Sequence, residues 1–225
     1  DPAPTNPGAL RFQPPLAPGA RVTWNEPAVL GERAVFIGDG KQTLYRINVK
    51  EGAQPTFGKE AESRVEGDLI SPIAANGDFV YAVVREGAGD ALQPFQAGNL
   101  QAMPKLALGG RYKAGPFVVG DKIFVELQER KLLCVEKDRQ VWQIDLARGP
   151  LSGKPQLLGN DLLLLHAAGA LARINLADGK ETAFAEAGEP LGEVVTTFGT
   201  AGNDRLLGGG RDGVLHIVPP PQATP

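Results

Sequence analysis

The chain has 225 residues, with 23 lysines plus arginines against 26 aspartates plus glutamates and a formal net charge of −3. This length allows one large β domain or two small ones, and the charge gives no reason to expect nucleic acid or a polybasic membrane contact. One cysteine, Cys134, excludes an internal disulfide, and two histidines, His166 and His216, exclude a multi-histidine metal site. The single cysteine also excludes a thiolate zinc cluster and a paired redox motif.

Prolines gather at both ends of the chain. Six lie within the first 18 residues and four within the last seven. Because proline lacks an amide hydrogen and fixes φ, we predict a proline-rich linker over residues 1–20 and a proline-rich tail over residues 219–225, with the folded domain over residues 21–218. No apolar run approaches the 18 residues of a transmembrane helix, so we expect no membrane span in this chain.

Five segments repeat one pattern, a short apolar stretch, a glycine turn and a second apolar stretch. They begin at Pro27, Pro72, Pro116, Pro155 and near Thr196, and their turn glycines are Gly31, Gly77, Gly120, Gly159 and Gly202. A third stretch begins 12 or 13 residues after the glycine in four of them, at Leu44, Leu132, Leu171 and Val214. A turn and an aromatic residue follow in three, at Phe57, Trp142 and Phe184. Each repeat is therefore predicted to form four strands.

Four short strands in a unit of about 40 to 45 residues are typical of a propeller blade. The sequence predicts an all-β fold, a β-propeller of four-stranded antiparallel blades, with about five blades in this chain. The second repeat departs from the pattern: its third stretch contains Pro94, and we interpret residues 96–111 as an insertion or irregular edge. The fifth repeat has three strands, and we predict that Arg21 to Trp24 supply its missing outer strand. Alternatively, the repeats belong to a larger propeller of seven or eight blades.

The repeats resemble a known family. LYRINVKEG at residues 44–52, ISPIAANGDFVYAV at 70–83 and LARINLADGKE at 171–181 are similar to the repeat of PQQ-like (quinoprotein and BamB-like) β-propellers. The resemblance implies a propeller fold and a periplasmic or extracellular location. The family contains quinoprotein dehydrogenases as well as non-enzymes. In those enzymes the cofactor lies over a vicinal cysteine pair, and this chain has only Cys134, so by comparison with them we expect no bound cofactor.

Two groups of residues are candidates for partner binding. The third position of the third strand holds Arg46, Cys134, Arg173 and His216, and its basic members either form a ring around the propeller for an anionic group or pair with nearby acids. The irregular region from Glu86 to Arg111 is either a binding surface or a packed blade edge, and it contains Phe95, Leu100, Met103 and Leu106. Cys134 itself is interpreted as a small buried apolar residue.

In an up-and-down blade alternate loops share a face of the propeller. We therefore expect the loops between second and third strands to lie on one rim with the segments that lead into each first strand. The favoured function is a non-enzymatic scaffold that binds a protein partner in a cell-envelope or surface assembly. The alternatives are a PQQ-dependent dehydrogenase-like or glycan-acting propeller enzyme, and a sensor that binds a small ligand in the central channel.

Overall fold

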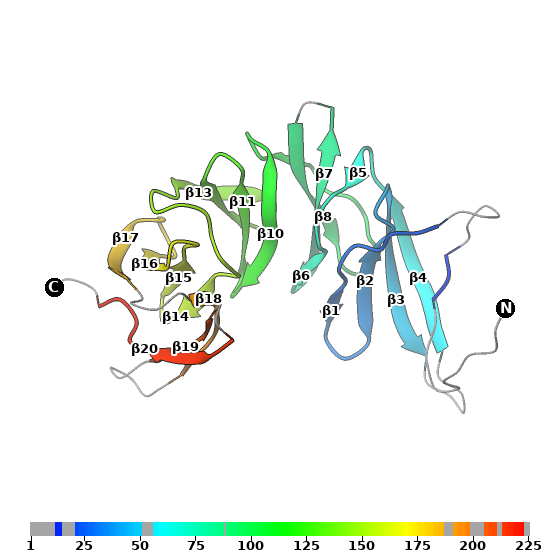
Figure 1. Cartoon of the computed structure of the whole chain (residues 1–225). Helices are drawn as coiled ribbons and strands as arrows, with labels where there is room; N and C mark the ends of the chain where they lie inside the picture. Colours follow the sequence, from blue (N-terminus) through cyan, green and yellow to red (C-terminus); the bar gives the residue numbers. More distant parts are fainter. Residues whose placement is uncertain are drawn as a thin grey trace. The chain divides into compact units, whose positions relative to one another are not determined.

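The computed structural model describes residues 12–14, 21–50, 56–87, 89–186, 191–198, 205–210 and 213–222, with the backbone alone at 191–198. All regular elements of these residues are β-strands, as predicted (Figure 1). The chain forms two compact units, Asp1–Ala107 and Leu108–Pro225, and each is described by itself.

The first unit contains two antiparallel sheets. The first sheet has the order β1-β2-β3-β4, and in the second sheet β7, β8 and β9 follow one another while β5 and β6 both pair with β7. The strands are β1 (Ala28–Leu30), β2 (Ala34–Gly38), β3 (Thr43–Lys50), β4 (Thr56–Arg64), β5 (Asp68–Leu69), β6 (Ala74–Asn76), β7 (Phe79–Glu86), β8 (Gly89–Gln96) and β9 (Leu106–Ala107).

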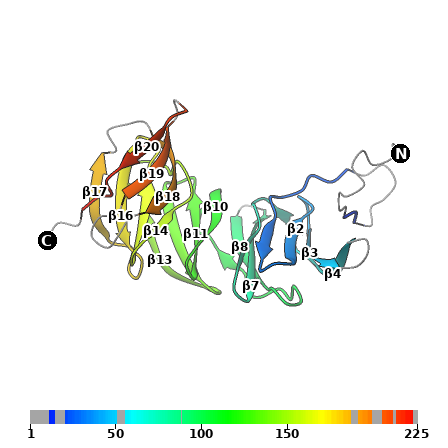
Figure 2. The same cartoon turned by 90° about the horizontal axis from the view of Figure 1, so that it is seen from below.

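The second unit contains three antiparallel sheets, two with four strands and one with three. The strands are β10 (Tyr112–Val119), β11 (Lys122–Leu127), β12 (Lys131–Glu136), β13 (Arg139–Asp145), β14 (Gln156–Leu158), β15 (Asp161–Leu165), β16 (Ala170–Asn175), β17 (Glu181–Glu186), β18 (Leu191–Phe198), β19 (Arg205–Gly210) and β20 (Leu215–Val218). Figure 2 shows the sheet of β18–β20 beside that of β14–β17. These up-and-down sheets are propeller blades, which confirms the predicted fold class.

The predicted turn glycines occupy the tight turns between first and second strands. Gly31, Gly77, Gly120 and Gly159 have φ between +58° and +63°. A residue with a Cβ rarely adopts this conformation, so glycine is favoured here. The fifth glycine of the series, Gly202, lies outside the described residues.

The core lies between the faces of neighbouring sheets. In the first unit Phe36 and Leu44 of the first sheet pack with Val80 and Phe95 of the second. In the second unit one cluster joins the sheets of β10–β13 and β14–β17, and another joins the latter to β18–β20. Because both faces of a central sheet are buried, its strands carry continuous apolar runs rather than alternating ones.

The first strand of the second sheet is broken into β5 and β6 around Ser71 and Pro72. Proline has no amide hydrogen to donate at this point. The Ser71 hydroxyl compensates, because its oxygen accepts a 2.8 Å hydrogen bond from the amide of Val83 on β7. The ladder therefore stays satisfied through the break.

The third strand of this sheet is more regular than we expected. Strand β8 pairs with β7 over its whole length, and Pro94 lies opposite Tyr81. The carbonyl of Pro94 accepts a 3.0 Å hydrogen bond from the amide of Met103. The irregular part is therefore confined to the segment after β8, and the fourth strand is reduced to the two-residue β9.

The predicted closure by Arg21 to Trp24 is wrong. Residues 21–27 form no strand, and β20 pairs only with β19 within the described part of the chain. The indole of Trp24 instead contacts the ring of Tyr45 on β3 and that of Phe12. The aromatic contacts of Trp24 therefore hold this segment against the first sheet.

Asn25 links this segment to both sheets of the first unit. Its side-chain Nδ2 donates to the carbonyls of Leu69 and Ser71 at 3.2 and 2.9 Å, and its Oδ1 accepts from the amide of Gly40 at 2.9 Å. A Cβ at Gly38 would lie 2.5 Å from this Oδ1. Position 38 therefore requires glycine because Asn25 occupies the space beside it.

Cys134 is a buried apolar residue, as predicted. It is fully buried and packs in the cluster with Phe124, Trp142 and Leu162. Burial raises the pKa of its thiol from 9.0 to about 12. The thiol is therefore neutral and shielded in the folded protein.

We predict that Gly38→Ala lowers the free energy of unfolding by about 1 to 3 kcal/mol, because the new methyl group displaces the Asn25 amide from its hydrogen bonds. Urea titration measures this loss. Gly89→Ala is the control, since a Cβ there meets no atom within 4 Å, and we expect a change below about 0.5 kcal/mol. If Gly38→Ala costs as much in an Asn25→Ala background as in the native one, the steric cause is wrong.

Alkaline pH tests the burial of Cys134. The folded-state pKa of about 12 is above the unfolded value of 9.0, so its contribution to stability is full below pH 9.0 and is lost as pH rises toward 12. We expect the stability difference between the native protein and Cys134→Ala to shrink by about 2 kcal/mol between about pH 7 and about pH 10.5. Urea titrations at both pH values measure it. A constant difference would contradict the raised pKa.

Candidate functional site

Loops between second and third strands lie beside the segments that lead into first strands. In the first unit the amide of Leu69 donates to the carbonyl of Lys41 at 2.6 Å. In the second unit the amide of Gln128 donates to the carbonyl of Arg111 at 2.8 Å. These bonds confirm the predicted shared rim within each unit.

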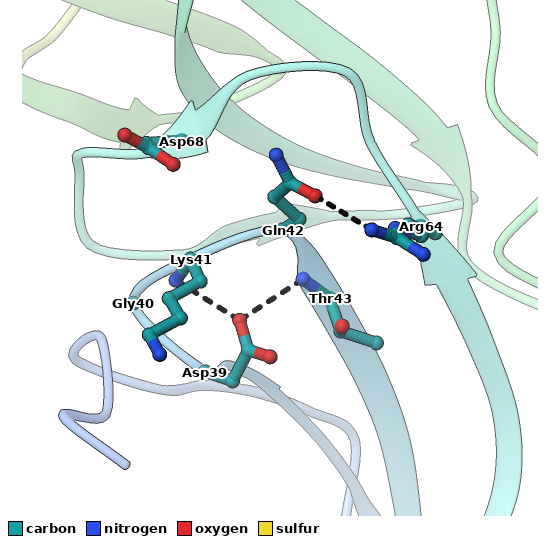
Figure 3. Close-up of a pocket in the computed structure, with 7 residues that line it drawn as sticks. All are labelled: Asp39, Gly40, Lys41, Gln42, Thr43, Arg64 and Asp68. Atoms are coloured by element: carbon teal, nitrogen blue, oxygen red, sulfur yellow. Dashed lines mark hydrogen bonds between the residues drawn. The ribbon is translucent and has the colours of Figure 1, made fainter. Parts of the chain in front are cut away.

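The rim of the first unit carries a polar pocket of about 490 Å³, shown in Figure 3. It lies between the β2–β3 loop and the segment that joins β4 to β5. Its lining consists of Asp39, Gly40, Lys41, Gln42, Thr43, Arg64 and Asp68.

The loop that forms one wall of this pocket is fixed by its own hydrogen bonds. The Asp39 carboxylate accepts from the amides of Lys41 and Thr43 at 2.9 and 3.0 Å (Figure 3). Gly40 has φ +67°, and a Cβ there would lie 2.1 Å from the carbonyl oxygen of Thr23. The pocket is therefore shaped before any ligand binds.

The pocket offers charges of both signs. Arg64 donates to the side-chain oxygen of Gln42 at 3.0 Å, while the side chains of Lys41 and Asp68 are exposed to solvent. The lining also contains the Thr43 hydroxyl and the Asp39 carboxylate. This arrangement is suited to hydrogen bonding with a polar group.

The second unit carries a groove of about 670 Å³ between its first two sheets. Within this unit it lies at the end of the sheets that carries the turns between first and second strands, beside Gly120 and Gly159. Two apolar side chains are exposed in it, Val141 by 38% and Leu157 by 42%. The groove also contains polar groups. Its lining consists of Gly120, Asp121, Lys122, Glu136, Val141, Leu157, Gly159, Asn160, Asn175, Leu176 and Ala177.

The polar border of this groove is held in place by contacts within the unit. Lys122 is mostly buried, and its ammonium lies 3.3 Å from the carboxylate of Glu136. The Trp142 indole donates to the carbonyl of Leu176 at 3.0 Å. The groove is therefore built on rigid strands and anchored turns.

Buried acids in both units are matched by bases. The carboxylate of Asp90 accepts two hydrogen bonds from Arg85, at 3.0 and 3.1 Å, and this bonding raises the pKa of the arginine. Glu126 accepts from Lys113 at 2.8 Å and from the amide of Leu151 at 3.1 Å. The hydrogen bonds of Asp90 and Glu126 therefore stabilise the folded units. Among the described residues no group of three or more histidine, cysteine, aspartate or glutamate side chains is arranged to hold a metal ion.

The buried histidine also has a local partner. The Nδ1 of His166 lies 2.8 Å from the carbonyl oxygen of Gly149, in the segment that leads into β14. His166 is buried and follows β15 directly. This contact joins the β15–β16 loop to the segment before β14, so the imidazole has a structural role.

The basic residues of the predicted ring differ in the sheet face that they occupy. Arg46 and Arg173 lie on the sheet face that packs against the following sheet, as Cys134 does. Arg46 donates to the carbonyl of Gly98, and its Nε is buried without a partner. Arg173 pairs with Asp161 of its own sheet at 2.5 Å. Arg46 and Arg173 therefore each make contacts within their own unit.

His216 points to the other face of its sheet, so its predicted place in the ring is wrong. It pairs with Gly208 and lies on the same face as Val218, whose side chain packs toward the preceding sheet. Side chains of a strand alternate between faces, so a shift of one residue reverses the face. The comparison of the repeats within this sequence therefore placed β20 one residue out of register.

The irregular region contributes more to the core than to the surface. Phe95 and Leu100 are fully buried in the cluster of the first unit, so for these two residues the structure agrees with a packed blade edge and contradicts a binding surface. Met103 is half-buried, and its carbonyl accepts a 2.6 Å hydrogen bond from Gln93. Of these three candidates, Met103 alone is partly accessible to a partner.

Sequence reasoning did not find the groove. Val141 lies next to the buried Trp142 on β13, and Leu157 belongs to the short β14. Their exposure depends on how two sheets meet, which a single strand pattern does not show. Both belonged to segments that the sequence predicted as ordinary strands.

Among the residues that the structure describes there is no helix long and apolar enough to cross a membrane. A search of curated proteins found no match. A family model described as outer membrane protein assembly factor BamB matches residues 96–213, slightly more than half of the chain.

Several solved structures share the fold at low sequence identity. BamB from Moraxella catarrhalis has a TM-score of 0.59 and 14% identity, with 84% of this chain and 58% of that chain covered. BBS1N in complex with ARL6DN has a TM-score of 0.61 and 14% identity, covering 93% and 69%. Hsv2 from Kluyvelomyces marxianus has a TM-score of 0.60 and 13% identity, covering 84% and 57%. The chain thus spans less than two thirds of the BamB structure.

The repeated four-stranded blades, the glycine turns and the match over residues 96–213 agree. The chain belongs to the PQQ-like propeller family of outer membrane protein assembly factor BamB.

Proposed function

We propose that this chain is a non-enzymatic propeller scaffold that binds a protein partner in a cell-envelope or surface assembly. The observation that carries the proposal is the groove between the sheets of β10–β13 and β14–β17. It combines two exposed apolar side chains, Val141 and Leu157, with the charged border of Lys122 and Glu136.

This combination fits a protein surface well. Specific interfaces have an apolar centre from which a partner excludes water and a polar rim that fixes its orientation. Removing apolar surface from water contributes about 25 cal/mol per Å². A partner side chain that covers Val141 and Leu157 therefore contributes to the free energy of binding. The 3.3 Å ion pair of Lys122 and Glu136 fixes both charged groups at the border of the groove, where they orient a partner.

The comparisons with known proteins support the proposed protein-binding function. The family is described by an outer membrane assembly factor, which favours an extracytoplasmic location for this chain. The similar BBS1N structure was solved in complex with ARL6DN, so a propeller of this shape can bind a protein. These are properties of the relatives, and they lend support here as analogy.

Site-specific crosslinking tests the groove. We expect a photoreactive amino acid at Leu157 to capture a defined partner from the envelope fraction of the source cells, because this side chain lies in the groove. The same residue at Glu60, an exposed position on β4, is the control and should not capture it. Val141→Asp, which places a charge in the apolar centre, should reduce the yield at Leu157 by at least about tenfold.

Two outcomes would overturn this proposal. Equal capture from Glu60 and Leu157 would show that the groove is not the contact surface. An undiminished yield in Val141→Asp, with the melting temperature unchanged, would show that its apolar centre does not bind the partner.

The rim pocket of the first unit favours a second candidate function, the recognition of a small polar ligand. Its fixed loop and opposite charges at Lys41 and Asp68 suit a ligand that carries both. We expect a thermal-shift screen of amino acids, sugars, anions and pyrroloquinoline quinone (PQQ) with calcium to find a ligand that raises the melting temperature of the native protein. The same ligand should not raise the melting temperature of Arg64→Ala. A ligand at about 100 times its Kd adds about 2.7 kcal/mol. If no compound raises the melting temperature, this candidate fails while the groove proposal stands.

A further inference from the structure

Arg46 is a half-buried cation without an acidic partner. It lies on β3, between the two sheets of the first unit. Its Nη1 donates to the carbonyl of Gly98 in the loop after β8, and its Nε is buried with no hydrogen-bond partner. No carboxylate of the described residues forms an ion pair with it. Because a charge that is partly withdrawn from water normally meets an opposite charge, the first unit leaves this cation incomplete.

The sheet of β14–β17 carries the same arrangement with an acid in place. Arg173 occupies the position in β16 that Arg46 occupies in β3. Asp161, two residues before the cross-strand partner of Arg173, accepts a 2.5 Å hydrogen bond from the Nε of this arginine. In β2 the residue two before the cross-strand partner of Arg46 is Ala34. The first sheet therefore has a methyl group where the matching sheet has a carboxylate.

The sheet of β10–β13 also carries opposite charges at this corner. Lys122 is the first residue of β11, as Asp161 is of β15 and Ala34 is of β2. Its ammonium lies 3.3 Å from the carboxylate of Glu136 on β12. Both four-stranded sheets of the second unit therefore place a cation and an acid together here. The first sheet of the chain places the cation alone.

We propose that Arg46 binds the oxyanion of a ligand, a carboxylate or phosphate group, which supplies the negative charge that Asp161 supplies to Arg173. A guanidinium is planar and presents several donors, so it fits two oxygens of such a group, and these charge-assisted hydrogen bonds are stronger than neutral ones. The Gly98 carbonyl takes one hydrogen of Nη1, and the remaining hydrogens of Nη1 and Nη2 are left for the anion.

This site depends only on the two sheets of the first unit. The guanidinium is held by a loop of the second sheet, and its strand belongs to the first. The site is separate from the groove at Leu157 and from the pocket beside Asp39, neither of which Arg46 lines. The proposal therefore stands or falls independently of the proposed protein-binding function.

NMR spectroscopy of the isotope-labelled full chain tests the proposal, with inorganic phosphate and acetate as probes. The Nε–H of Arg46 is shielded from water, so its resonance is observable. At constant ionic strength we expect phosphate or acetate to shift this resonance saturably, with an apparent Kd of about 1 to 10 mM. The Nε–H of Arg173 is the internal control, because it is already bonded to Asp161 and should not move.

Ala34→Asp supplies the missing acid from within the chain. We expect the new carboxylate to pair with Arg46 as Asp161 pairs with Arg173, and to weaken binding of both probes by at least about tenfold. Ala34→Asn has nearly the same size without the charge, and it should bind them within about threefold of the native protein. Circular dichroism confirms that both variants are folded.

The proposal is overturned if neither probe shifts the Arg46 resonance, if the Arg173 resonance shifts with the same dependence, or if Ala34→Asp binds as tightly as Ala34→Asn. It is also overturned if the native resonance responds only after Asp78→Asn or Glu51→Gln, since an acid of this chain would then be the counterion. Tighter binding of phosphate supports a phosphate-bearing ligand, and tighter binding of acetate supports a carboxylate-bearing one.

Discussion

The structure depends on the burial of sheet faces against neighbouring sheets. Each short blade has too few residues to form a core alone, so Phe36, Phe124 and Leu163 are covered only when the next sheet packs over them. This constraint explains why strands such as β7 and β12 are apolar on both faces. It also explains the positions of buried polar groups such as Asp90 and Glu126, which lie near the rim where a base or an amide reaches them.

The same constraint limits where this chain is able to bind anything. A side chain between two packed sheets, such as Arg173 beside Asp161, is occupied by the fold itself. The surfaces that remain accessible lie mainly at the rims, where loops and sheet junctions meet solvent. The pocket beside Asp39 and the groove at Leu157 are both of this kind.

Local patterns predicted the fold well because they depend on local physics. The turn glycines have positive φ, and the third strands begin within a residue or two of the predicted positions. The site was predicted less well because it depends on which face a residue occupies and on what packs against that face. A shift of one residue placed His216 on the wrong face, and the burial of Phe95 depends on the first sheet. The contact of Trp24 with Tyr45 likewise depends on packing between distant segments.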